Sequence, residues 1–204
     1  VMSEVGMLPA ELMNLKVNKF KNFNYLINNK YFTQQLVSNV YCVYSLYKRK
    51  KTNLIILNYD PSMNDLCYWY QQLISESLGK KKNGLMPIIS SVPKDFHSLL
   101  QLYLDGPKNN FFTIFSSKHE RSYKLSNFAI PKSMQFIRGK KLETIVNSQK
   151  IATENVFSKK NIPFRTFHFS MKREEELGLI FTFFVLETIL LSQLIKVNPF
   201  DQPA

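Results

Sequence analysis

The sequence predicts an α/β fold, specifically a three-layer sandwich built on a mostly parallel β-sheet. Short apolar runs of strand length recur along the chain, and a segment of helical character follows each of them. Strands that alternate with helices imply a parallel sheet covered on both faces, and the continuously apolar run 54–57 is typical of a strand buried on both faces. The 204 residues, of which 45% are hydrophobic, suffice for the core of one domain.

The first predicted helix has apolar residues at helical spacing and ends in a basic run, which suits a helix C-terminus. The strand after it contains the run Leu54-Ile55-Ile56-Leu57. Ser62 is expected to cap the next helix and Gly79 to end it. The predicted elements are, in chain order, helix 30–51, strand 53–59, helix 63–78, strand 86–91, helix 94–104, strand 111–116, helix 140–157, strand 164–169 and helix 172–196.

The formal net charge of +12 favours an anionic partner, such as nucleic acid, acidic lipid or a phosphorylated metabolite. Only five of the 27 basic residues are arginine, the side chain best suited to bidentate contacts with phosphate and guanine. A solvated, lysine-rich surface is therefore favoured, and no nucleic-acid partner is predicted. A basic nucleic-acid-binding domain stays an alternative, and it would show a steep salt dependence of binding.

The stretch 177–195 is almost wholly apolar and long enough to cross a bilayer. Glu187 lies near its centre, where a carboxylate would cost roughly 3 kcal/mol on insertion scales. A helix buried inside the domain is therefore predicted rather than a membrane span, which stays an alternative that cell fractionation would test.

The two cysteines, Cys42 and Cys67, lie in apolar helical stretches. They are expected to be buried free thiols in a reducing compartment rather than a disulfide. The first residues also lack the basic start and apolar core of a signal peptide. A cytoplasmic location is therefore expected.

Two groups of polar residues are candidates for chemistry. Gln72 and Glu76 are four residues apart on one helix face, and Glu76 falls in the last turn, where the helix dipole disfavours a negative charge and so favours proton uptake. His97 follows a predicted strand and can supply a proton near pH 7. Spacing alone favours a surface Gln/Glu pair and an ordinary exposed histidine over functional roles. The sequence has no standard dinucleotide, nucleoside-triphosphate or zinc motif.

Three segments, in order along the chain, resemble the phosphoglucose isomerase family. The stretch 69–80, with Gln71-Gln72 and Glu76-Ser77-Leu78-Gly79-Lys80, is similar to its Gln-Gln-x-x-x-Glu-Ser-x-Gly-Lys segment. Residues 94–98 resemble its histidine loop, with Phe96 where the family commonly has glutamine, and Tyr103-Leu104-Asp105-Gly106-Pro107 follows. Residues 199–204 match the start of a second signature that normally runs on through Val-Glu to a lysine.

The resemblance implies an activity and roles for four residues. The family interconverts glucose 6-phosphate and fructose 6-phosphate through an enediol, and Glu76 matches its base. His97 matches a histidine that assists ring opening from the neighbouring subunit, which implies a homodimer. Gln72 and Gln202 match glutamines at the sugar-phosphate site. No metal or organic cofactor is expected. A non-catalytic sugar-phosphate-binding module on the same fold is the alternative function.

The resemblance covers only the second of the two sugar-isomerase domains of the family. The chain is therefore expected to be one incomplete C-terminal domain, with 1–29 as a connecting segment, 30–197 as the α/β core and 198–204 as the start of the second signature. The family's serine- and threonine-rich phosphate loop, a Gly-Gly-Arg segment and the lysine have no counterpart here. Little or no turnover is expected from the chain alone, because positioning and charge stabilisation would be lost.

Overall fold

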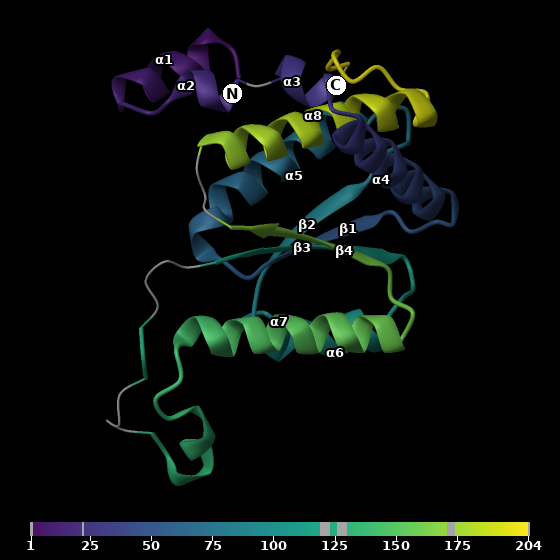
Figure 1. Cartoon of the computed structure of the whole chain (residues 1–204). Coiled ribbons are helices and arrows are strands. Elements are labelled where there is room, and N and C mark those ends of the chain that lie inside the picture. Colours follow the sequence, from purple (N-terminus) through teal and green to yellow (C-terminus); the bar gives the residue numbers. More distant parts are fainter. Residues whose placement is uncertain (1, 22, 119–122, 126–129, 171–173, 204) are drawn as a thin grey trace. The chain divides into compact units, whose positions relative to one another are not determined.

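A computed structural model of the chain describes residues 2–21, 23–118, 123–125, 130–170 and 174–203. Contacts group the chain into two compact units (Figure 1). Residues 1–53, 68–87 and 171–204 form the unit that we call the helical unit, and residues 54–67 and 88–170 form the sheet unit.

The helices and strands follow the alternation that the sequence predicts. Their bounds are α1 Glu4–Leu12, α2 Val17–Phe20, α3 Phe23–Asn28, α4 Lys30–Lys48, β1 Asn53–Asn58, η1 Pro61–Met63, α5 Asn64–Leu78, β2 Met86–Ser91, α6 Phe96–Asp105, β3 Asn110–Ser117, η2 Lys132–Ile137, α7 Leu142–Lys159, β4 Phe164–Phe169 and α8 Glu174–Ile195.

The sheet has four parallel strands in the order β2-β1-β3-β4. Strands β3 and β4 pair from Phe112 opposite Phe164 to Ser117 opposite Phe169. At the β1–β2 pair, the amide of Val92 donates to the carbonyl of Asn58. A parallel sheet flanked by helices confirms the predicted α/β class and agrees with a three-layer sandwich.

The core of the sheet unit lies between the sheet and helices α6 and α7, which share one face of the sheet (Figure 1). Ile55 and Leu57 of β1 point into it, together with Phe112 of β3 and Phe157 of α7. The residues of β1 that alternate with these, such as Ile56, are also buried. Both faces of β1 are therefore covered, which explains the unbroken apolar run, since each such side chain contributes about 1.5–3 kcal/mol on burial.

Helices α4, α5 and α8 form the core of the helical unit. The rings of Tyr70 in α5 and Phe184 in α8 stack with centroids 3.9 Å apart, and Phe32 of α4 meets Phe183 edge to face. At Gly178 the backbone of α2 comes so close to α8 that an added Cβ would lie 2.1 Å from the carbonyl oxygen of Phe20. Only glycine fits there.

Helix α8 is the one helix among the described residues that is long and apolar enough to cross a membrane by length and composition. Its Glu187 side chain is 1% exposed and accepts hydrogen bonds from Asn39 Nδ2 of α4 at 2.6 Å and from the Tyr70 hydroxyl of α5 at 3.1 Å. A buried carboxylate with such partners is typical of a helix in a protein core.

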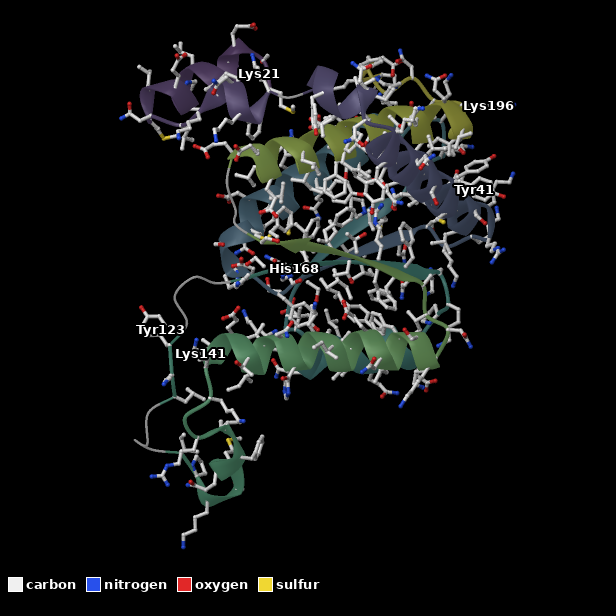
Figure 2. All side chains as sticks on the ribbon, in the orientation of Figure 1. Lys21, Tyr41, Tyr123, Lys141, His168 and Lys196 are labelled. Atoms are coloured by element: carbon white, nitrogen blue, oxygen red, sulfur yellow. The ribbon has the colours of Figure 1, made fainter. Side chains whose placement is uncertain are left out.

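Two local predictions are wrong. Ser62 does not cap α5, because it lies inside the 3₁₀ turn η1 that precedes this helix. Asp60 caps that turn, and its carboxylate accepts from the Ser62 amide and hydroxyl. Cys67 is a buried free thiol as expected, but Cys42 is a free thiol on the exposed face of α4, next to the exposed Tyr41 (Figure 2). The apolar residues of α4 that face the core are its Leu36, Val40 and Val43 stripe instead.

Candidate active site

Glu76 and Gln72 lie one turn apart at the end of α5, and both side chains are exposed. The amide nitrogen Nε2 of Gln72 donates to Oε1 of Glu76 at 2.8 Å. The opposite face of α5 is buried through Tyr70, Ile74 and Leu78, which fixes the rotation of the helix and turns the Gln72 and Glu76 pair outward.

Gln202 reaches the same carboxylate from a segment 126 residues further along the chain. Its Nε2 donates to Oε2 of Glu76 at 3.2 Å, so each carboxylate oxygen of Glu76 accepts one amide hydrogen bond. The structure thus brings together three of the four site residues that the sequence predicts: Gln72, Glu76 and Gln202.

Lys80 holds the segment that carries Gln202. Its ammonium group forms an ion pair with Asp201 Oδ1 at 2.9 Å and donates to the carbonyl oxygen of Asn198 at 2.7 Å and to the carbonyl oxygen of Asp201. The Lys80 side chain is only 5% exposed. Lys80 also lowers the pKa of Asp201, chiefly through the hydrogen bond to its carboxylate.

Sequence reasoning assigned no role to Lys80 or Asp201, although both lie inside the quoted segments. The available signal was that Lys80 and Asp201 have opposite charges and that each lies in a segment that resembles the isomerase family. A run of three lysines at 80–82 reads as a solvated loop, and nothing in the spacing distinguishes the buried first lysine from its exposed neighbours.

His97 lies in the first turn of α6, in the sheet unit, and its side chain is exposed. The turn before it is fixed by Asp95 Oδ2, which accepts from the Ser91 amide at 2.7 Å. Phe96, the departure from the family pattern, packs edge to face against Tyr59 with ring centroids 6.3 Å apart. Phe96 therefore anchors the histidine turn through packing rather than through a polar contact.

The described part of the chain holds no group of three or more His, Cys, Asp or Glu side chains arranged for a metal ion. Around Glu76 the groups are one carboxylate and two amides. This arrangement offers a proton acceptor with fixed hydrogen-bond donors, which suits proton transfer at carbon.

The chain is similar to known proteins over its whole length. No family model matches the chain. Across its full length, the chain is 30% identical to glucose-6-phosphate isomerase of Mycoplasmopsis synoviae and covers 49% of that protein. It is 28% identical to the probable glucose-6-phosphate isomerase of Methanococcus maripaludis and covers 47% of it. The chain is homologous to glucose-6-phosphate isomerases. It spans about half the length of the curated relatives it matches.

Solved structures support the fold. A hypothetical protein from Thermus thermophilus superposes with a TM-score of 0.85 at 19% identity, over 99% of this chain and 51% of that one. A glucose-6-phosphate isomerase from Chlamydia trachomatis matches with a TM-score of 0.56 at 14% identity, over 74% of this chain and 32% of that one. At these identities the likeness concerns the fold of the chain.

Proposed function

We propose that the chain forms part of the active site of an aldose–ketose isomerase that interconverts glucose 6-phosphate and fructose 6-phosphate, a step of glycolysis and gluconeogenesis. One observation carries the proposal: the Glu76 carboxylate accepts amide hydrogen bonds from Gln72 and from Gln202, which come from two sequence segments that separately resemble the isomerase family. The names of the homologous proteins point to the same reaction.

In the proposed mechanism Glu76 is the base. Its carboxylate takes the proton from C2 of the open-chain aldose, the electron pair moves to form the C1–C2 double bond, and O1 is protonated, which gives an enediol. When the proton returns to C1, the O2 hydroxyl loses its proton and the C1–C2 double bond is replaced by the C2–O2 double bond, which gives the ketose. The two amides hold the carboxylate oxygens in position before substrate arrives, which lowers the entropic cost of reaching the reactive geometry.

His97 is proposed to donate a proton during ring opening at the active site of a second copy, so the working unit is a homodimer. The exposed position of the histidine leaves it accessible to a partner. The net charge of +12 provides a field that attracts a sugar phosphate. A cytoplasmic location, with no membrane or nucleic-acid partner, completes the proposal.

A chimera tests the role of Glu76. This chain would replace the matching half of the Mycoplasmopsis synoviae isomerase, and the Glu76→Gln substitution would be introduced into the chimera. Loss of the base should lower kcat by roughly 10²–10⁴-fold, because general base catalysis contributes about that much. Calorimetric binding of fructose 6-phosphate should stay within a few-fold, since the neutral amide has the same shape.

The matched control is Glu11→Gln, which neutralises an exposed glutamate of α1 and should leave kcat unchanged. Equal turnover of the Glu76→Gln chimera and the parent chimera would remove Glu76 as the base. A folded parent chimera that binds sugar phosphate without turnover would instead favour the non-catalytic binding module.

A further inference from the structure

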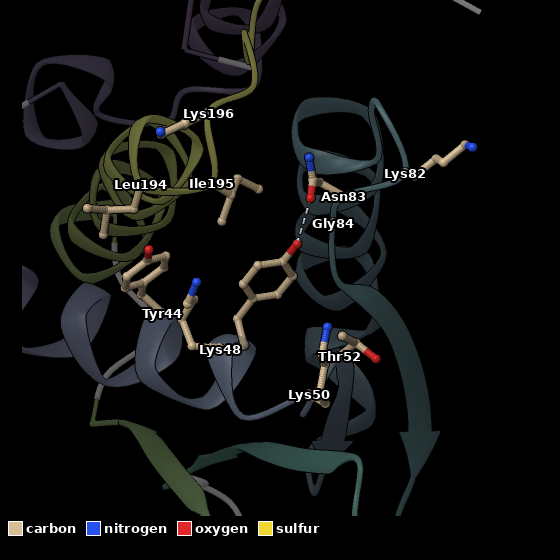
Figure 3. Close-up of a pocket in the computed structure, with 11 residues that line it drawn as sticks. Tyr44, Lys48, Lys50, Thr52, Lys82, Asn83, Gly84, Leu194, Ile195 and Lys196 are labelled. Atoms are coloured by element: carbon tan, nitrogen blue, oxygen red, sulfur yellow. Dashed lines mark hydrogen bonds between the residues drawn. The ribbon is translucent and has the colours of Figure 1, made fainter.

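The helical unit contains a cavity of about 600 Å³ that shares no residue with the Glu76 site. Three segments meet around it: the end of α4 with Lys48 and Lys50, the loop after α5 with Lys82, and the end of α8 with Lys196 (Figure 3). A volume of this size is typical of small-molecule sites.

The cavity is strongly basic. Four lysines line it, and none of its described lining residues is acidic. Within the described part of the chain, the ammonium groups of these four lysines have no ion-pair partner. The C-terminal ends of α4 and α8 carry about half a negative charge each, so a net charge of about +3 remains.

The backbone at these lysines is unusual. Lys50, Lys82 and Lys196 have φ angles of 62°, 62° and 60°, in the left-handed region that non-glycine residues seldom adopt. Residues held in such backbone conformations cluster at functional sites.

Four helix ends among the described residues share one hydrogen-bond pattern, the Schellman motif, in which a single left-handed residue ends the helix. At the ends of α1 and α7 that residue is Asn14 and Asn161, and asparagine tolerates the conformation well. At the ends of α4 and α8 it is Lys50 and Lys196, and both line the cavity. Of these four helix ends, the two that line the cavity therefore have lysine at the left-handed position, and the two that do not line it have asparagine.

The walls provide more than charge. The hydroxyl of Tyr47 in α4 donates to Oδ1 of Asn83 at 2.9 Å, so the α4 end and the loop after α5 are joined (the dashed line to Asn83 in Figure 3). Tyr44, Leu194 and Ile195 add aromatic and apolar surface. The ammonium groups of Lys82 and Lys196 point away from the other lining residues in Figure 3. Their side chains are flexible enough to turn toward a ligand in the cavity.

We propose that this cavity binds a small, multiply phosphorylated molecule, separately from any substrate at the Glu76 site. Lysine binds phosphate as a point charge, and four such charges around one cavity suit a ligand with two or more phosphate groups. Confinement to a cavity favours a small molecule over nucleic acid, which needs an extended basic face. The proposal does not depend on the isomerase activity.

The test uses inorganic pyrophosphate and the full 204-residue chain in isothermal titration calorimetry at low salt. The wild-type chain should bind with a Kd below about 1 mM. The double variant Lys50→Asn/Lys196→Asn should bind at least about tenfold more weakly, because two charge-assisted contacts are lost. Asparagine already occupies the equivalent positions of α1 and α7, so the variant should keep its circular dichroism and Tm.

The control variant Lys159→Asn/Lys160→Asn removes the same charge at the end of α7, where neither lysine lines the cavity. Its pyrophosphate affinity should stay within about twofold of wild type, since the solvent screens exposed charges that do not contact the ligand. Equal weakening in both variants would show that only the overall charge attracts the anion and would overturn the proposal. Absence of binding by the wild-type chain at about 1 mM probe would overturn it as well.

Discussion

Lys80 contacts the chain segment that carries Gln202, and Gln202 in turn contacts Glu76. Its ammonium group gathers three oxygen atoms of Asn198 and Asp201, next to Gln202 in the chain. A nearly buried lysine is unusual, and it is stable here only because its hydrogen bonds replace the lost hydration. Lys80 thus acts as a positioning residue for the carboxylate–amide cluster.

The Lys80→Met substitution should therefore lower the free energy of unfolding by about 1–3 kcal/mol, as expected when hydrogen bonds to a charged group are lost. It should also speed hydrogen exchange in residues 198–203, because that segment would be released. Denaturant unfolding and exchange mass spectrometry measure the two effects.

The exposed neighbour Lys81 provides the control, because Lys81→Met should change stability by no more than about 0.5 kcal/mol. Unchanged exchange in 198–203 of the Lys80→Met variant would contradict a positioning role for Lys80.

The sequence allowed part of this site to be predicted. Helical spacing placed Gln72 beside Glu76, and the hydrogen bond between them confirms that placement. The contact with Gln202 could not come from spacing, because 126 residues separate it from Glu76 and only folding brings the segments together. Only the resemblance to a known family suggested it. The role of Lys80 was missed because sequence patterns do not reveal burial of one lysine among three.

Regular elements were the easiest part to predict. Strands β2 and β4 have the predicted bounds, because glycine, proline or asparagine residues close to these short runs mark where they begin or end. Helix starts were less predictable. Before α5, the carboxylate of Asp60 rather than the hydroxyl of Ser62 accepts a backbone hydrogen bond, and spacing in the sequence does not distinguish these two neighbouring polar side chains.

The left-handed backbone conformation of a lysine at a helix end lowers the free energy of unfolding. Lys196 occupies a left-handed position where glycine is usual, so Lys196→Gly should raise the free energy of unfolding by about 1 kcal/mol. Lys159 lies inside the last turn of α7, and there the same change to glycine should lower it by about 0.5–1 kcal/mol. Denaturant unfolding of the two variants should show a rise in the free energy of unfolding for Lys196→Gly and a fall for Lys159→Gly. A loss of stability in Lys196→Gly would contradict the strain assigned to that residue.

At the scale of the whole molecule, the proposed homodimer requires a site completed by two copies. A mixture of Glu76→Gln and His97→Ala chimeras should therefore regain about a quarter of the parent activity. Half of the dimers formed at random contain one of each subunit, and one of their two sites has both residues intact.

The measurement is the coupled isomerase rate of equal amounts of the two inactive chimeras after joint unfolding and refolding. Each chimera refolded alone serves as the control and should remain inactive. A mixture that stays inactive, while light scattering shows dimers, would contradict donation of His97 across the interface.

The buried Glu187 of α8 has a consequence for how the protein is made. Of the described helices, α8 leaves the ribosome last, after the α4 and α5 segments that supply Asn39 and Tyr70. The apolar helix α8 therefore emerges when the residues that donate hydrogen bonds to its carboxylate have already been synthesised. Before α8 packs against α4 and α5, the same carboxylate opposes transfer of the helix into a bilayer by about 2.5–3.5 kcal/mol. This cost favours packing of the new helix against the protein over its insertion into a membrane.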